Sequence, residues 1–320
     1  MADEKLTEKV GRAIAMIRLA ADISEAYYKK PLRIAYSGGK DSDVLADLAV
    51  RSGAGVEFSN NHTSVDAPET VYHIRRVFER LRASGYEARV QYPRDETGRQ
   101  ITMWRLIEEK GFPPTRLARY CCEVLKEGGG NKRITALGVR ADESSARSER
   151  SEYEVIGTTK KKGIGLGFEH VREVFDDAKH MDEVWDCAFI TRAKKNADLV
   201  CNPIIGWSED DVWEYIRENQ LVYNPLYDRG YRRVGCVGCP LAGRKTMLKE
   251  FSDFPKYKKI YMHTFERMLK KRWENGKKTG WQCAEDVFAW WTQDPDHIPG
   301  QMRIELLDDF VQSETGGKKP

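Results

Sequence analysis

The residues best suited to chemistry form a short loop between an apolar segment, 32–36, and a segment of helical pattern, 44–50. The loop consists of Ser37, Gly38, Gly39, Lys40, Asp41 and Ser42. Glycine lets the backbone approach an anion without a Cβ clash, and a following helix points its free N–H groups at that anion. The serine hydroxyls add donors, and Lys40 adds positive charge. The order strand, loop, helix predicts a phosphate site; a plain turn before a capped helix is the alternative.

The spacing of this loop excludes the two commonest phosphate motifs. A Walker A loop reads G-x-x-x-x-G-K-[ST], and a dinucleotide loop reads G-x-G-x-x-G. Neither pattern fits Ser37–Ser42. The loop resembles instead the PP-loop of ATP pyrophosphatases and their relatives. That resemblance implies that it holds the phosphates of an adenine nucleotide.

Length and charge set the broad class of the protein. The chain has 320 residues, long enough for a large domain with an appendage, and its 53 basic and 50 acidic residues leave a formal charge of +3. Bulk charge therefore neither favours nor excludes a nucleic acid partner. No apolar run approaches the roughly 20 residues that cross a bilayer, and residues 1–5 do not begin a secretory signal. We expect a cytoplasmic protein with no membrane partner.

Segments of strand and helix pattern alternate along the first two-thirds of the chain. Strands are predicted near 32–36, 56–60, 86–92, 133–139 and 199–205, and helices near 5–28, 41–52, 68–84, 101–110, 116–127 and 208–219. Ser208 with Asp211 three positions later is a capping-box pattern. Such alternation predicts an α/β fold with a doubly wound, mostly parallel sheet, in which ligands bind at the carboxyl ends of the strands.

The domain organisation is predicted from where this alternation holds. Residues 1–29 are an N-terminal helix, 30–240 the sheet domain, and 241–320 a helical, aromatic C-terminal extension. Within the sheet domain, residues from about 141 to 198 lose the pattern and become basic and rich in glycine. We interpret this insertion as an elaborated loop over the active edge, which suits a polyanionic substrate or a nucleic acid strand. A solvated insertion of mixed charge is the alternative.

The chain has seven cysteines, which in a reducing compartment indicate metal or redox chemistry before disulfides. Two pairs supply four thiols: Cys121, Cys122, Cys236 and Cys239. Four thiolates suit a [4Fe–4S] cluster or a tetrahedral zinc ion. The adjacent pair favours the cluster, whose separate iron corners can each take one of two neighbouring thiolates. Cys187, Cys201 and Cys283 have no partner at chelating spacing, and we expect buried small side chains there.

With these features together, the chain resembles the phosphoadenosine phosphosulfate (PAPS) reductase superfamily, whose fold is that of the PP-loop, or adenine nucleotide alpha hydrolase-like, proteins. The likeness rests on Ser37–Ser42, on 138–147, on 202–231 and on the four paired cysteines. It implies that the nucleotide and its anionic group are met by Gly138, Arg140, Ser144 and Arg147. The cysteine pattern is similar to that of adenylylsulfate (APS) reductases, whose cysteines hold a [4Fe–4S] cluster, and to cluster-bearing proteins of DNA phosphorothioation.

The chain departs from the superfamily pattern at two places. Sulfonucleotide reductases attack sulfur with a cysteine in a C-terminal Glu-Cys-Gly-(Leu/Ile)-His segment, which this chain lacks. Its last cysteine lies instead in Trp281–Glu285. The Asp-Thr-Gly after the second strand is also replaced, by residues 60–66. The nucleotide pocket and the cluster are therefore better supported than the reductase reaction.

The function predicted from the sequence is an adenylation of ATP-pyrophosphatase type that is coupled to sulfur transfer. Lys40 and Mg²⁺ would offset charge on the leaving pyrophosphate, and Arg140 and Arg147 would steady the α-phosphate or the substrate anion. Asp41 is the candidate metal-side carboxylate, with charge complementation of the helix N-terminus as its alternative role.

Two other functions stay open. One is a PAPS or APS reductase that releases sulfite, with Cys283 as the nucleophile. The other is a non-catalytic, nucleotide-binding assembly protein in which zinc or a cluster only joins two segments. A partner protein that delivers sulfur or electrons is compatible with each catalytic function.

Overall fold

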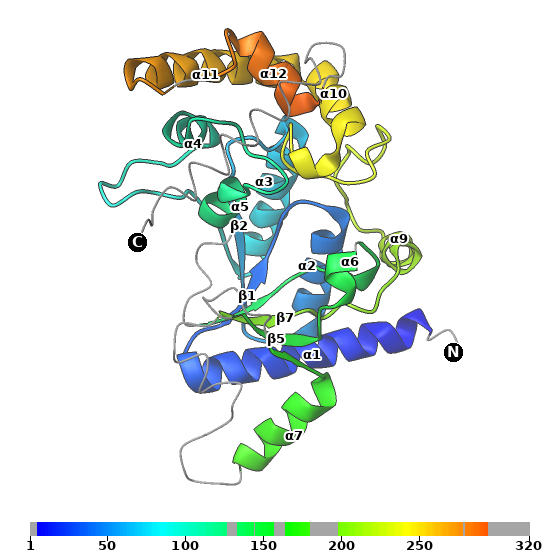
Figure 1. Cartoon of the computed structure of the whole chain (residues 1–320). Helices are drawn as coiled ribbons and strands as arrows, with labels where there is room; N and C mark the ends of the chain where they lie inside the picture. The colour runs from blue at the N-terminus through cyan, green and yellow to red at the C-terminus, as the bar shows by residue number, and fades with distance from the viewer. Residues whose placement is uncertain are drawn as a thin grey trace. The chain divides into compact units, whose positions relative to one another are not determined.

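The computed structural model describes residues 5–126, 133–143, 145–156, 164–179, 198–277 and 279–293 (Figure 1). The chain divides into two compact units. Unit 1 comprises Met1–Asn61, Pro68–Gln91 and Glu127–Val234. Unit 2 comprises His62–Ala67, Tyr92–Lys126 and Gly235–Pro320. Each unit is therefore assembled from three separate stretches of chain.

Unit 1 is built on a seven-stranded sheet of order β3-β2-β1-β4-β7-β5-β6. The strands are β1 (Leu32–Ala35), β2 (Val56–Asn61), β3 (Glu87–Gln91), β4 (Ile134–Ala136), β5 (Tyr153–Ile156), β6 (Ile164–Leu166) and β7 (Asp198–Cys201). Strands β1, β2, β3, β4 and β7 run parallel, and each lies where the sequence predicted a strand. The predicted α/β fold with a mostly parallel sheet is confirmed.

The predicted loop at 141–198 is wrong where the structure describes it. Strand β5 pairs antiparallel with β7 and with β6, so this stretch extends the sheet at one edge. These strands are short and polar and lie next to glycines, so their sequence pattern was too weak to predict them as strands. Tyr153 is nonetheless fully buried, and the Arg150 guanidinium binds the Glu154 carboxylate at 2.8 and 2.5 Å. Residues 157–163 and 180–197 lie outside the described part of the chain.

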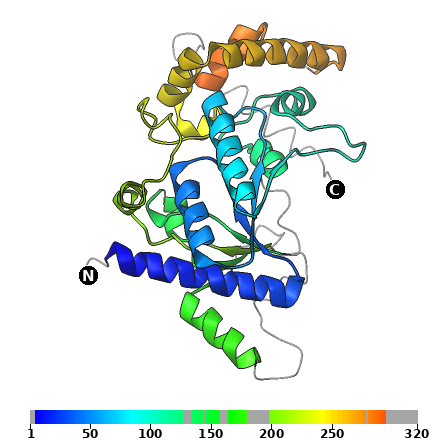
Figure 2. The same cartoon turned by 180° about the vertical axis from the view of Figure 1, so that it is seen from behind.

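The helices of unit 1 cover the sheet and supply its core. They are α1 (Leu6–Tyr28), α2 (Lys40–Ser52), α3 (Pro68–Ala83), α6 (Ser145–Ser148), α7 (Phe168–Lys179) and α9 (Glu209–Glu218), with a 3₁₀ turn η1 (Ala141–Glu143). Figure 2 shows α2 and α3 side by side on one face of the sheet. Leu45 of α2 and Phe78 of α3 share a core with Ile34 and Phe58 of the strands, all at most 1% exposed.

The predicted capping box at the start of α9 is confirmed. The Ser208 hydroxyl accepts the Asp211 N–H at 3.1 Å, and the Asp211 carboxylate accepts the Ser208 N–H at 2.6 Å. Two of the helix's free donors are thereby satisfied, which fixes the residue where α9 begins. The buried face of α9 then follows at Val212, Tyr215 and Ile216.

Unit 2 is mostly helical. Its elements are α4 (Met103–Lys110), α5 (Tyr120–Leu125), the 3₁₀ turn η2 (Pro240–Ala242), α10 (Arg244–Asp253), α11 (Pro255–Glu274) and α12 (Ala284–Thr292). The predicted helix at 116–127 is shorter than expected. Thr115 closes a turn first, because its hydroxyl accepts the Ala118 N–H at 2.9 Å and its own N–H donates to the Ala118 carbonyl at 3.1 Å.

Aromatic side chains form the core of unit 2, as the sequence predicted. Tyr261, Phe265 and Trp291 are at most 4% exposed, and their rings contact one another with centroids 4.7 to 6.0 Å apart. Trp273, by contrast, is 52% exposed. None of the helices that the structure describes is both long enough and apolar enough to cross a membrane.

Candidate functional site

The loop Ser37–Ser42 follows β1, and its last three residues form the first turn of α2. Gly39 is the N-cap of α2 and offers no side chain to its free N–H groups. Gly38 has a φ of +77°, and a Cβ added there would lie 2.8 Å from a side-chain carbon of Ile74. The Ser42 hydroxyl donates to the Gly39 carbonyl at 2.7 Å. The loop is thus a tight turn that leaves a helix N-terminus able to bind an anion.

Two buried cations meet at this helix N-terminus. Lys40 is 4% exposed, and its Nζ lies 3.5 Å from the Asp41 carboxylate and 3.5 Å from that of Glu209. Arg140 is 3% exposed and donates from Nε to Asp41 at 2.5 Å. Asp41 therefore joins a lysine of the loop to an arginine that follows β4. Positive charge so held at the start of a helix suits a bound oxyanion.

Gly138 brings the two segments close together. A Cβ on Gly138 would lie 2.9 Å from the Asp41 carbonyl oxygen, so any larger residue would push the segment after β4 away from α2. The predicted set of Ser37, Gly38, Gly39, Lys40, Asp41, Ser42, Gly138 and Arg140 is gathered at one place in unit 1.

The other two predicted residues are placed differently. Arg147 pairs with Glu143 four positions earlier and is linked to the loop only indirectly, since the Glu143 carboxylate accepts the Arg140 N–H at 3.3 Å. Ser144 lies outside the described residues.

Residues 224 to 227 contribute two side chains that the sequence analysis did not assign to the site. Asn224 is fully buried and donates to the Gly38 carbonyl at 2.9 Å. The Tyr227 hydroxyl accepts the backbone N–H of Lys40 at 3.0 Å. The resemblance to the superfamily included this stretch, but nothing in the local pattern showed that it lies against a loop almost two hundred residues earlier.

A buried polar cluster lies behind the loop. Asp43 of α2 accepts hydrogen bonds from Tyr36 and, at 2.8 Å, from His73 of α3. Burial raises the pKa of Asp43, and hydrogen bonds from His73 and Tyr36 oppose that rise. These contacts join the residue before the loop to the helix after it, and so fix the direction in which α2 points.

In unit 2, both cysteine pairs line one cavity of about 30 Å³. Cys121 and Cys122 lie in the first turn of α5, and Cys236 and Cys239 lie on the turn before η2. The Cys239 N–H donates to the Cys236 carbonyl at 3.2 Å, which closes that turn. Among the residues that the structure describes, no three His, Cys, Asp or Glu side chains stand close enough to hold a single metal ion.

Gly238 is the residue that lets this turn pack on the aromatic core. Its φ is +77°, and a Cβ there would lie 2.7 Å from Phe251 and 2.9 Å from Trp291. The Gly238 N–H donates to the buried Glu250 carboxylate at 2.7 Å. The turn that contains Cys236 and Cys239 is therefore fixed both by packing on the aromatic core and by this hydrogen bond.

The thiols around the cavity differ in acidity. Burial raises the pKa of Cys236 to about 11. A hydrogen bond between the thiols of Cys121 and Cys122 raises the pKa of the first and lowers that of the second. The negative charge of Cys236, when it forms, raises the pKa of Lys126, which also lines the cavity. Thiols are the donor type that soft metal ions and iron–sulfur clusters take, although no three of the described donors stand close enough together to hold one ion.

The comparison with protein families settles the class of the chain. The model of the phosphoadenosine phosphosulfate reductase domain matches residues 31–242. The chain belongs to this family. The PAPS reductase domain so defined contains the phosphate loop, Arg140 and all four paired cysteines.

The chain is also similar to individual proteins. An adenosine 5'-phosphosulfate reductase of Anoxybacillus flavithermus is 25% identical over 221 residues, which cover 67% of this chain and 74% of that protein. The uncharacterized protein MJ0066 of Methanocaldococcus jannaschii is 26% identical over 266 residues, and the matched part is 77% of this chain but only 41% of that protein. A crystal structure of PAPS reductase from Candida auris matches with a TM-score of 0.43 and 16% identity, over 74% of this chain and 96% of that one.

The remaining cysteines of this PAPS reductase family member differ in exposure. Cys201 is fully buried, as predicted, and burial raises its pKa. Cys283 is exposed, so the expectation of a packed thiol there is wrong. Cys283 is the N-cap of α12, and the buried contacts come from its neighbours Trp281 and Val287 instead. Cys187 lies outside the described residues.

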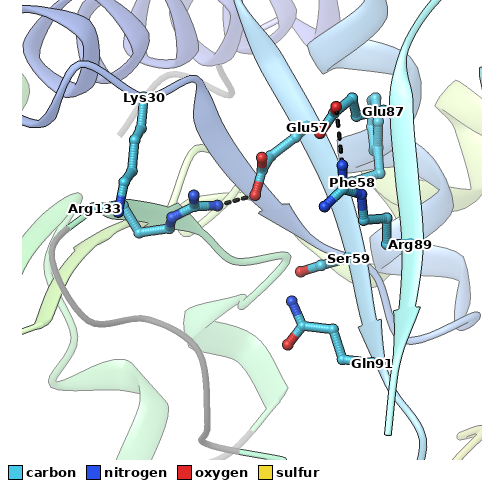
Figure 3. Close-up of a pocket in the computed structure, with 8 residues that line it drawn as sticks. All are labelled: Lys30, Glu57, Phe58, Ser59, Glu87, Arg89, Gln91 and Arg133. Atoms are coloured by element: carbon cyan, nitrogen blue, oxygen red, sulfur yellow. Dashed lines mark hydrogen bonds and ion pairs between the residues drawn. The ribbon is translucent and has the colours of Figure 1, made fainter.

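Unit 1 also has a larger hollow, lined mainly by residues of β2 and β3 (Figure 3). Its volume is about 270 Å³, and its lining is Lys30, Glu57, Phe58, Ser59, Glu87, Arg89, Gln91 and Arg133. The charges pair within it: Glu57 binds Arg133, and Glu87 binds Arg89 at 3.1 Å. Because Glu57 and Ser59 alternate with the buried Phe58, this lining is the polar face of a strand. None of the predicted site residues lies there.

Proposed function

We propose that this protein binds an adenine nucleotide at Ser37–Ser42 and transfers its adenylyl group to a substrate that then receives sulfur. The observation that carries the proposal is the meeting of Lys40, Asp41 and Arg140 at the uncapped N-terminus of α2. A polyphosphate needs hydrogen-bond donors and positive charge at one point, and Lys40 and Arg140 beside the start of α2 supply the charge. Membership of the PAPS reductase family supports an adenylated ligand.

The chemistry that we propose has two balanced steps. A substrate oxygen attacks the α-phosphorus of ATP, and the bond from that phosphorus to the pyrophosphate oxygen breaks. A sulfur nucleophile then displaces AMP from the adenylated substrate. Lys40 stabilises the negative charge that grows on the leaving pyrophosphate, and Arg140 holds the α-phosphate. Arg147 contacts Glu143, whose carboxylate accepts the Arg140 N–H, so we assign Arg147 a positioning role.

Asp41 serves first to position the two cations. Its carboxylate contacts both Lys40 and Arg140, and it orients them before the nucleotide arrives. Carboxylate oxygens also suit Mg²⁺, and the Asp41 carboxylate, 17% exposed, is the residue that would hold the ion beside the phosphates. The Ser37 and Ser42 hydroxyls complete the polar lining of the loop.

We propose that Cys121, Cys122, Cys236 and Cys239 hold a [4Fe–4S] cluster, with zinc as the alternative. Support comes from the donor set, since four thiols line one cavity and two of them are adjacent in sequence. When bound, the cluster would supply a site for sulfur or for an electron. The chain's own part is to keep these four thiols near one another, through the short α5 and the turn at Gly238.

One anaerobic experiment tests these proposals together. The purified protein is assayed for iron and acid-labile sulfide, and then incubated in parallel with ATP, APS and PAPS. Release of pyrophosphate from ATP is the result expected. Intact binding of nucleotide with no product from any of the three would point to an assembly protein and would contradict the adenylation.

A reductase that releases sulfite is the second candidate, favoured by one observation. Cys283 is exposed, and a thiol that attacks a sulfonucleotide must be accessible. In this reaction the thiolate would attack the sulfur of APS or PAPS, the nucleotide would leave, and a dithiol donor would then release sulfite. The similarity to adenosine 5'-phosphosulfate reductases supports the substrate class. Sulfite production with a thiol donor, without pyrophosphate from ATP, would select this candidate.

A further inference from the structure

Tyr227 lies where the phosphate site is expected to begin. Its hydroxyl accepts the backbone N–H of Lys40 at 3.0 Å, across 187 positions of sequence. Lys40 is the first residue of α2, so this N–H is one of the helix donors that have no partner within the helix. In a phosphate-binding loop, such donors bind oxygen atoms of the anion. A phenol oxygen occupies that acceptor position here.

Two more contacts bring Tyr227 against the loop. The Lys40 Nζ lies 5.3 Å from the centre of the Tyr227 ring, within the range of a cation–π contact. A Cβ built on Gly39 would lie 3.2 Å from the Tyr227 hydroxyl, so a larger residue there would crowd the phenol. An oxyanion that enters the loop must therefore meet the phenol as well as Lys40.

The segment that carries Tyr227 is held in place. Asn224 donates to the Gly38 carbonyl at 2.9 Å and to the Thr70 hydroxyl at 3.1 Å, and its side-chain oxygen accepts the Leu226 N–H at 3.1 Å. Trp213 packs edge-on against the Tyr227 ring with centroids 5.3 Å apart. These contacts fix the backbone that carries Tyr227 and pack its ring on one side.

The hydroxyl keeps a proton that it can donate. It uses an oxygen lone pair to accept the Lys40 N–H, which leaves its own O–H directed elsewhere. Burial raises the pKa of Tyr227, and the nearby Asp41 and Asp43 carboxylates raise it further, against the opposing hydrogen bond from Lys40. Tyr227 is therefore a neutral donor over the whole working pH range.

We propose that Tyr227 contacts the substrate: its hydroxyl accepts the Lys40 N–H and donates its own hydrogen to an oxygen of the nucleotide's phosphate or phosphosulfate group. The inference rests on the proposed nucleotide site and adds a residue to it. In this arrangement the first N–H group of α2 does not bind the oxyanion directly. It binds the Tyr227 hydroxyl, which in turn binds the oxyanion. If the ligand instead had to displace the phenol from the Lys40 N–H, removing the Tyr227 hydroxyl would strengthen binding of the ligand.

Tyr227→Phe tests this role, with Tyr223→Phe as the matched control. The control removes a hydroxyl from the same segment, one that donates to Asp228 at 2.8 Å and whose ring also packs on Trp213. Binding of ATP, inorganic pyrophosphate and adenosine is measured by calorimetry for the parent and both variants. A hydrogen bond to a charged group contributes about 1.5–3 kcal/mol, so Tyr227→Phe should weaken ATP and pyrophosphate binding by about tenfold to a hundredfold.

Adenosine binding separates this role from a structural one. It should be the same in Tyr227→Phe as in the parent, because adenosine lacks the oxyanion, and Tyr223→Phe should match the parent for all three ligands. Equal or tighter pyrophosphate binding by Tyr227→Phe would overturn the inference while leaving the proposed function intact. A parent that binds neither ATP nor pyrophosphate would instead overturn the proposed function, and the inference with it.

A second variant decides the question if Tyr227→Phe does not fold. Replacing Tyr227 by 3-fluorotyrosine keeps the ring and the hydroxyl but makes the hydroxyl a stronger donor. Pyrophosphate should then bind more tightly than to the parent. Unchanged or weaker binding would overturn the proposed contact.

Discussion

In unit 1 the proposed phosphate loop, Ser37–Ser42, is one contiguous run. In unit 2 the cavity lined by Cys121, Cys122, Cys236 and Cys239, here called the thiol cavity, takes its cysteines from two turns far apart in sequence. The loop's shape depends on Gly38 and on the start of α2, and remote residues are added around it. The cavity has no local part that could bind a metal alone. The first kind of site can be recognised from a few letters of sequence, and the second only from the spacing and pairing of one residue type.

The two sites should therefore fail in different ways when single residues are changed. A loop substitution removes one contact among several, but a cysteine substitution removes a ligand on which the whole centre depends. The following predictions test that difference, from the largest effect to the smallest.

Cys236→Ala should give the largest effect. With one ligand gone, we expect the anaerobically purified protein to lose its iron and acid-labile sulfide almost entirely. Its thermal unfolding temperature should fall, because metal binding energy is part of folding energy. Metal content and unfolding are measured on one preparation, with Cys283→Ser as the control that removes a thiol outside the cavity. A variant that keeps the parent's iron content would refute the ligand assignment.

Lys40→Ala should weaken ATP binding by about tenfold to a hundredfold, since a buried charge that binds phosphate is lost. Iron content should not change, because no ligand of the thiol cavity is touched. Isothermal calorimetry and an iron assay check both statements. Lys270→Ala, which removes an exposed lysine, should match the parent in both. If Lys40→Ala binds ATP as tightly as the parent, Lys40 does not bind the phosphates and the loop is only a structural turn.

Gly38→Ala should destabilise the protein by about 1–3 kcal/mol and also weaken ATP binding. Two causes act: the φ of +77° and a Cβ 2.8 Å from Ile74. Gly53→Ala is the matched control, since Gly53 has a φ of +65° with nothing within 4 Å of its Cβ position. The control should show the smaller loss in chemical denaturation and no loss of ATP affinity. Equal losses in the two variants would mean that crowding at Gly38 has no effect.

Cys283→Ser should give the smallest effect. The side chain is exposed at the start of α12, so stability, iron content and pyrophosphate release should all match the parent. Product assays with ATP, APS and PAPS check this. If the parent makes sulfite and the variant makes none, the adenylation is contradicted and the sulfite-releasing reductase is the function supported.

The fold could be predicted from the sequence because its signals are local. Five strands and the capping box at Ser208 follow from apolar runs and residue spacing, and all are present. Strands β5 and β6 were missed, since three or four residues of mixed polarity become a strand only through pairing, here of β5 with β7 and of β6 with β5. Pairing across the sheet, and not local propensity, decides such strands.

The same limit explains what was missed in the candidate site. Gly138 and Arg140 could be named because they resemble a family motif, and they do lie against the loop. Asn224 and Tyr227 carry no charge and no distinctive spacing of their own. Their contacts with Gly38 and Lys40 exist only after the sheet has brought the two segments together. Cys283 was expected to be packed because its neighbours are apolar, yet the cap position turns its side chain outward.

The division of unit 2 among three stretches also sets an order of events during synthesis. Cys121 and Cys122 leave the ribosome long before Cys236 and Cys239, and the helices that support the second pair come later still. A growing chain folds its N-terminal parts first. The first pair therefore waits as two adjacent free thiols while most of the sheet is already made. Loading of the metal centre would then be one of the last steps of this protein's maturation, and arrested or truncated chains would expose an oxidisable thiol pair.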